Sequence, residues 1–129
     1  MKGIYIAVVV FAIVVVGAVL AISAAPSEGI RLPYYATSQP MTKEAYMFAV
    51  ENPEQLNGIN CYCGCMQHSH SGRIHSRGLL DCFMKEDGSF EKHASECDMC
   101  LNDALAVKQM SLDGVQKDEI KAAIDDKYR

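Results

Sequence analysis

The sequence predicts a mainly α-helical protein: an N-terminal transmembrane helix followed by a small helical domain with an irregular segment rich in cysteine and histidine. Three observations lead to this fold class. An apolar run without charge covers residues 4–22, apolar side chains recur at helical spacing in several later stretches, and all six cysteines lie within residues 61–100. We therefore expect a transmembrane signal anchor at residues 1–25, a stalk at 26–41 and the domain at 42–129.

The apolar run is long enough to cross a membrane. A helix rising about 1.5 Å per residue covers a hydrocarbon core of about 30 Å with roughly 20 residues. Lys2 favours a cytoplasmic N-terminus, which places the domain outside the cytoplasm, in the cell membrane as a single-pass protein. A cleaved signal peptide is the alternative. We favour an anchor because the run exceeds a usual signal-peptide core and cleavage after Ala25 would leave Pro26 first.

Charge and composition exclude one class of partner and indicate a need for cross-links. Without Lys2, the remaining 11 basic and 16 acidic side chains give a net charge of −5, which argues against nucleic-acid binding. The whole chain has no Trp and only four Phe, one of which, Phe11, lies in the apolar run. A core so poor in aromatic residues is marginal at this size, so we expect a metal or disulfides to stabilise it.

Two short helices are expected before the cysteines. Thr42 can cap a helix in which Ala45, Phe48 and Ala49 share one face. Asn52, Pro53 and Gln55 then resemble a capping box with proline at the first helical position, and Gly58 is a helix stop.

The rest of the chain alternates irregular and helical stretches. Residues 58–91 have no lasting period and predict a loop, with a brief strand at 82–84. Ser95 and Asp98 predict a capping box for a helix that ends near Met110. A final helix should follow the Asp113-Gly114 turn, with Ile120, Ala123, Ile124 and Tyr128 at helical spacing.

The cysteine and histidine pattern is the strongest indication of function. Cys61-Tyr62-Cys63-Gly64-Cys65 presents alternating thiols, and cysteines two apart close only a strained ring, so each thiol needs a distant partner or a shared metal. Cys97 and Cys100 lie near a predicted helix N-terminus, which stabilises thiolates. We interpret His70 and His75 as solvated loop residues. The predicted metal ligands are Cys61, Cys63, Cys65, His68, Cys82, His93, Cys97 and Cys100.

Several of these motifs together resemble a known family. Asn60 to Cys65, Asp81-Cys82-Phe83, the block from His93 through Cys97 and Cys100 to Leu101, and the ending from Glu119 to Tyr128 look like the bacterial and archaeal family named for its PCYCGC motif. The resemblance covers about residues 44–128. It implies an exported, membrane-anchored protein with a metal-related role. Asn60 stands where the family has proline.

Two interpretations of the six cysteines remain open, and they need not exclude each other, because a four-ligand zinc site with one disulfide between the other two cysteines would also account for all six. Thiolate and imidazole with nearby Met66, Met84 and Met99 form a soft donor set, which favours Cu(I) and then Zn(II) as the cofactor. The function would then be metal storage, or transfer to or from a metal donor or acceptor protein. The alternative is an extracytoplasmic interaction module held by three disulfides, with fifteen possible connectivities.

Other chemistries have less support. An Fe–S cluster would lack an obvious loading route outside the cytoplasm. Leu101, rather than histidine, follows Cys100, which disfavours covalent haem. No βαβ pattern surrounds the Cys97 and Cys100 pair, which disfavours a thiol oxidoreductase. There is no nucleophile elbow and no HExxH motif. We therefore expect a binding protein rather than an enzyme.

Overall fold

The computed structural model describes residues 29–68 and 74–129. The predicted transmembrane segment, residues 1–25, lies outside them. Within the described residues, no helix combines the length and the apolar character needed to cross a bilayer. Residues 31–129 pack together as one unit, which contains all six cysteines.

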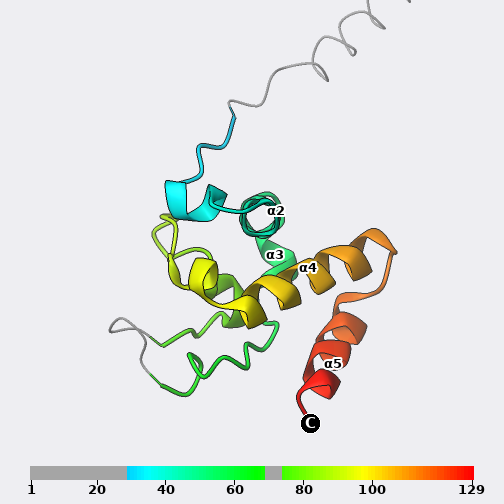
Figure 1. Cartoon of the computed structure of the whole chain (residues 1–129). Helices are drawn as coiled ribbons and strands as arrows, with labels where there is room; N and C mark the ends of the chain where they lie inside the picture. The colour runs from blue at the N-terminus through cyan, green and yellow to red at the C-terminus, as the bar shows by residue number, and fades with distance from the viewer. Residues whose placement is uncertain (1–28, 69–73) are drawn as a thin grey trace, which may run out of the picture. The chain divides into compact units, whose positions relative to one another are not determined.

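Helices provide the regular structure of the described residues, as Figure 1 shows, and these residues form no named β-strand. The mainly α prediction is therefore confirmed for this part of the chain. The elements in chain order are the 3₁₀-helix η1 (Tyr34–Thr37), α2 (Pro40–Glu51), α3 (Pro53–Leu56), the 3₁₀-helices η2 (Gly78–Cys82) and η3 (His93–Glu96), α4 (Asp98–Leu112) and α5 (Lys117–Lys127).

The first two α-helices begin at prolines. α2 starts at Pro40, two residues before the expected cap Thr42, because proline is already set to the helical φ at the first turn; Thr42 is buried instead. α3 starts at Pro53 as expected. Its predicted capping box is wrong, since Asn52 makes no side-chain cap hydrogen bond and the side chain of Gln55 accepts a hydrogen bond from Ser111 of α4 at 3.3 Å.

The capping box expected at Ser95 and Asp98 and the strand expected at residues 82–84 are both absent from the structure. α4 begins at Asp98 with Cys97 at the cap position, and the hydroxyl of Ser95 donates to the carbonyl of Lys92 at 2.7 Å, so Ser95 and Asp98 form no capping box. Residues 82–84 form no strand. Cys82 ends η2, and a single antiparallel bridge joins Met84 to Phe90.

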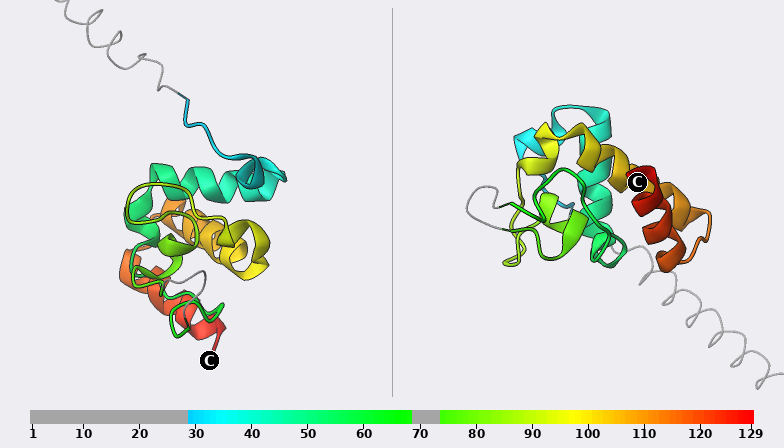
Figure 2. Two further views of the ribbon diagram at one scale, coloured as in Figure 1. Left: turned by 90° about the vertical axis from the view of Figure 1, so that its left-hand side faces the viewer. Right: turned by 90° about the horizontal axis from the view of Figure 1, so that it is seen from below.

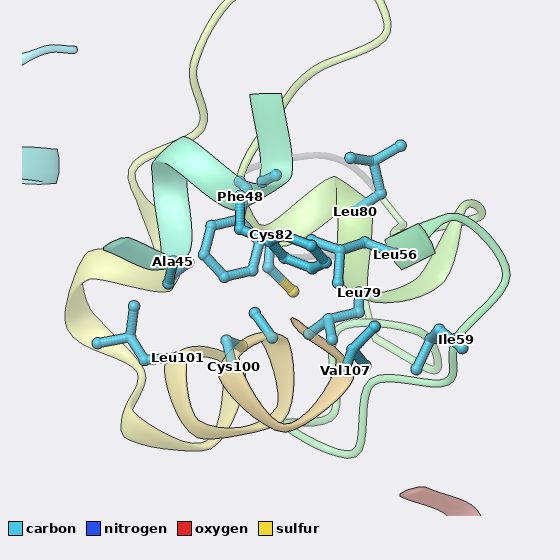
Figure 3. Close-up of a cluster of buried hydrophobic side chains, with 14 of the residues drawn as sticks. Ala45, Phe48, Leu56, Ile59, Leu79, Leu80, Cys82, Cys100, Leu101 and Val107 are labelled. Carbon is cyan, nitrogen blue, oxygen red and sulfur yellow. The ribbon is translucent and has the colours of Figure 1, made fainter. Parts of the chain in front are cut away.

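α4 is the central element of the unit and packs against α2, α3, α5, η2 and η3 (Figures 1 and 2). Figure 3 shows how Ala45 and Phe48 of α2 face Leu101 and Val107 of α4 across the core. Cysteine sulfur belongs to this core, because the side chains of Cys82 and Cys100 lie among the apolar groups and are fully buried. The core therefore connects the helices directly to the cysteine-rich loop.

The end of α5 is anchored on α4 by a buried carboxylate. Asp103 has no exposed surface and accepts hydrogen bonds from the Lys127 ammonium at 2.7 Å and from the Tyr128 hydroxyl at 2.9 Å. The bond to Asp103 raises the pKa of Lys127 above its usual value. Ile120 and Ile124 bury the adjacent face of α5, as the helical spacing predicts, whereas Ala123 is exposed.

Candidate metal centre

Backbone hydrogen bonds hold two segments of the cysteine-rich loop between α3 and α4, residues 59–65 and 75–79, side by side. The N–H of Leu79 donates to the carbonyl of Ile59 at 2.8 Å, and the N–H of His75 donates to that of Cys65 at 3.0 Å. Gly78 makes this approach possible, because it has φ +69° and a Cβ there would lie 2.1 Å from the Ile59 oxygen. The pairing brings the alternating thiols of residues 61–65 close to Cys82.

A second set of contacts ties the start of the motif to α5. The amide of Asn60 donates to the Asp125 carboxylate at 2.9 Å, the hydroxyl of Tyr62 donates to the same oxygen at 3.0 Å, and Tyr62 stacks on Tyr128 with ring centroids 4.7 Å apart. Burial opposes ionisation of Asp125, but these bonds and Lys121 outweigh it and hold its pKa below the usual value. Contacts with Asp125 and Tyr128 at the C-terminal end of the chain therefore hold residues 60–62, at the start of the cysteine motif, in place.

The cysteine sulfurs form one connected cluster. The Sγ of Cys61 lies 2.9 Å from that of Cys63, 3.5 Å from that of Cys82 and 3.7 Å from that of Cys100. The Sγ of Cys97 lies 3.1 Å from that of Cys100. Thiols from the loop, from η2 and from the start of α4 therefore meet at the centre of the unit.

Two imidazoles extend the cluster. Nε2 of His93 lies 3.5 Å from the sulfur of Cys63 and 3.4 Å from that of Cys65. Nδ1 of His75 lies 3.4 Å from the sulfur of Cys82, and the two rings are 5.6 Å apart. The interpretation of His75 as a solvated residue is therefore wrong, since only 2% of its surface is exposed.

The remaining histidines and the methionines stand apart from these contacts. His68 is exposed, and its backbone N–H donates to the carbonyl of Gly64 at 3.0 Å. His70 lies outside the described residues. The sulfur of Met66 accepts a hydrogen bond from the backbone N–H of Cys61 at 3.1 Å, so it is beside the cluster and already engaged. Sequence spacing could not separate these residues from His75, because its position depends on how the loop folds back.

Among the described residues, two overlapping sets of four side chains could each hold a metal ion. One comprises Cys61, Cys63, Cys82 and Cys100, and the other comprises Cys63, His93, Cys97 and Cys100. Within each set, the candidate ligand atoms all lie within 4.8 Å of one another. Six of the eight ligands predicted from the sequence belong to these sets. Cys65 is buried beside His93 but belongs to neither.

The environment distributes protons unevenly among the thiols. Hydrogen bonds from the Cys100 thiol and then from Cys61 lower the pKa of Cys63, whereas donation to Cys61 and Cys63 raises the pKa of Cys100. Burial raises the pKa of Cys65 to about 12. The hydrogen bond from the Cys100 thiol also lowers the pKa of Cys61, so Cys61 and Cys63 favour the thiolate while Cys65 and Cys100 retain their protons unless a cation replaces them.

All six cysteines are free thiols in the structure. The sulfurs of Cys61 and Cys63, and of Cys97 and Cys100, are nevertheless only 2.9 and 3.1 Å apart, against about 2.05 Å in a disulfide. The arrangement can therefore converge on a metal ion, or close into cross-links after oxidation.

Comparison with known proteins identifies the family. A sequence model described as "Protein of unknown function with PCYCGC motif" matches residues 23–129. The chain belongs to this family, as the resemblance of its motifs predicts. No curated protein matches the chain. No solved structure matches it either.

Proposed function

We propose that this member of the PCYCGC family is a membrane-anchored, extracytoplasmic protein whose cysteine and histidine cluster binds a soft transition metal, Cu(I) by preference and Zn(II) next. One observation carries the proposal: five thiols and one imidazole from distant parts of the chain gather in two overlapping four-ligand sets. Clustered thiolates with imidazole suit Cu(I) and Zn(II) and disfavour Mg²⁺ and Ca²⁺.

Storage or transfer is the role that fits such a site. Cys61, Cys82 and Cys100 are buried, which shields bound metal from water, whereas Cys63, Cys97 and His93 are only half-buried. A partner protein can approach from the half-buried side and exchange thiolate ligands one at a time.

The location is proposed from the sequence. The apolar run of residues 4–22 supports a single-pass anchor, and Lys2 supports export of the domain. The full chain should remain in the membrane fraction after a high-salt wash, which strips proteins held only by charge. Recovery of a soluble form beginning near Pro26 would contradict the anchor and indicate a cleaved signal peptide.

Metal content and free thiols, measured on one sample of the full chain purified in detergent from its native compartment, test the binding function. We expect bound copper or zinc and fewer than three disulfides. Competition between Cu(I) and Zn(II) for the metal-free, reduced protein then tests the preference for copper. Binding of both ions should weaken as pH falls, because protons reclaim thiolates and imidazole.

The second candidate function is a disulfide-stapled interaction module without metal. The short sulfur separations of Cys97 with Cys100, at 3.1 Å, and of Cys61 with the distant Cys82, at 3.5 Å, favour it. Oxidation of all six cysteines would lower the mass by six hydrogens relative to the reduced chain. A native, folded sample with that mass and no metal would support this module and contradict the metal function.

A further inference from the structure

We infer that the cluster holds two metal ions bridged by the sulfurs of Cys63 and Cys100, rather than one ion. The inference rests on the proposed metal function and specifies its stoichiometry. The ligand class is a pair of divalent, four-coordinate d¹⁰ ions, of which Zn(II) is the one that the proposed function names. Cys61 and Cys82 would complete the coordination of one ion, and His93 and Cys97 that of the other.

The cluster has too few ligand side chains to bind two ions unless some of the ligands bridge both ions. Two tetrahedral ions need eight metal–ligand bonds. The two sets together contain only six side chains, and the two residues common to both are Cys63 and Cys100. A thiolate has several lone pairs and can bind two ions, whereas the second nitrogen of His93 points away from the ion that the first would bind. The two shared residues are thus both cysteines, the residue type that can bridge.

The distances suit this arrangement. Four sulfurs at about 2.3 Å from a tetrahedral ion lie about 3.8 Å from one another. The sulfur of Cys61 is already 3.5 Å from that of Cys82 and 3.7 Å from that of Cys100. The closer pair of Cys61 and Cys63, at 2.9 Å, would open by about 1 Å to reach the spacing of a tetrahedral site.

Charge also favours a second ion. Five thiolates around one divalent ion leave a net charge of −3, in a cluster where Cys61, Cys82 and Cys100 are buried. A second divalent ion reduces this to −1. Because uncompensated charge is expensive to bury, the second ion allows all five thiols to ionise together.

Native mass spectrometry with Zn(II) tests the stoichiometry on the reduced full chain in detergent. The unmodified protein should bind two zinc ions. Cys61→Ser and Cys97→Ser each remove a ligand from one ion only and should reduce the count to one. Cys63→Ser removes a bridge and should leave at most one. Tyr62→Phe is the matched control, since Tyr62 lies between Cys61 and Cys63 but belongs to neither set and supplies no sulfur or imidazole, and it should retain two.

Cadmium NMR of the unmodified protein tests bridging without any variant. Two cadmium resonances with scalar coupling between them are expected, since the coupling passes through a shared sulfur. Two uncoupled resonances, a count of one zinc ion, or retention of two zinc ions by a Cys63→Ser protein with native helical circular dichroism would each overturn the inference while leaving metal binding intact. Binding of no zinc, cadmium or Cu(I) would overturn the inference and the proposed function together.

Discussion

The helices and the cysteine-rich loop are stabilised in different ways. α2 and α5 each bury an apolar face against α4, with residues such as Phe48, Val107 and Ile120 in the shared core. Between α3 and α4 the described chain has only two short 3₁₀-helices and one isolated bridge. That segment places the apolar side chains of Ile59, Leu79 and Phe83 in the same core, but the rest of it is held by a few long-range hydrogen bonds and by its cluster of thiols and imidazoles.

This difference indicates which part of the protein depends on metal. Apolar packing needs no cofactor, whereas clustered thiols gain stability only when an ion or a cross-link joins them. The helices should therefore remain ordered under conditions that release the loop. Removal of metal and three single substitutions test that division, and metal removal should have the largest effect.

Removal of metal should release the loop and spare the helices. We expect the free energy of unfolding to fall by at least about 5 kcal/mol, because ligand binding and folding of the loop are coupled. Hydrogen exchange before and after chelation measures this by region. Amides of residues 57–97 should lose protection, while those of α2 and α4 serve as the internal control. Equal loss of protection throughout would contradict the division.

Gly78→Ala should disturb the loop at its narrowest point. The left-handed backbone costs alanine about 1–2 kcal/mol, and the clash with the Ile59 carbonyl adds about 1–3 kcal/mol, so we expect a loss near 3 kcal/mol. Gly88→Ala is the matched control, because Gly88 has φ +81° and no atom close to its Cβ position. Urea unfolding should show a much smaller loss for the control; equal losses would refute the role of close approach.

Tyr46→Phe should weaken the attachment of the loop to α2. The Tyr46 hydroxyl donates to the carbonyl of Glu91 at 2.6 Å, and its ring packs edge-on against Phe83 at 5.0 Å. Because the ring is retained, only the hydrogen bond is lost, at about 1–1.5 kcal/mol. Tyr34→Phe, at a tyrosine that is 88% exposed, should change thermal stability little. A similar effect of both variants would show that the bond does not stabilise the loop.

Asp125→Asn should have the smallest effect, less than about 1 kcal/mol at neutral pH, because the carboxylate is partly screened by solvent. The pKa of Asp125 lies below 3.8 in the folded protein, so its charge stabilises the fold above that pH. That contribution is lost as pH falls through the folded pKa, and the two proteins should converge in stability there. Unfolding measured against pH, with Asp118→Asn on the same helix as control, tests the sign; a difference that grows with acid would contradict it.

The sequence predicts the fold best where the physics is local. The spacing of apolar residues and the prolines and glycines predict α2, α3, α4 and α5 to within a few residues. Apart from the strand expected at residues 82–84, the errors lie at helix ends, since Ser95 and Gln55 both have suitable capping partners in sequence but bond elsewhere once the chain folds. Capping depends on which competing partner tertiary packing brings closer.

The sequence predicts most of the residues that form the candidate site, but it does not predict which of them contact one another. Cysteine spacing indicates the thiols, and His93 is included because of its fixed distance before Cys97. The location of His75 cannot be inferred, because its contact with Cys82 depends on the pairing of the two loop segments at Gly78. Asn60 also becomes informative only in three dimensions, where its amide forms a hydrogen bond that proline could not donate.

The buried carboxylate of Asp103 determines where this chain can be shortened for experiments. Both of its described partners, Lys127 and Tyr128, belong to the last three residues. A shorter chain that stops before them would leave an ionised side chain buried inside α4 without its cation, which costs about 3–5 kcal/mol. Expression plasmids for the unit of residues 31–129 should therefore retain the residues through 129 and place any affinity tag beyond a flexible spacer.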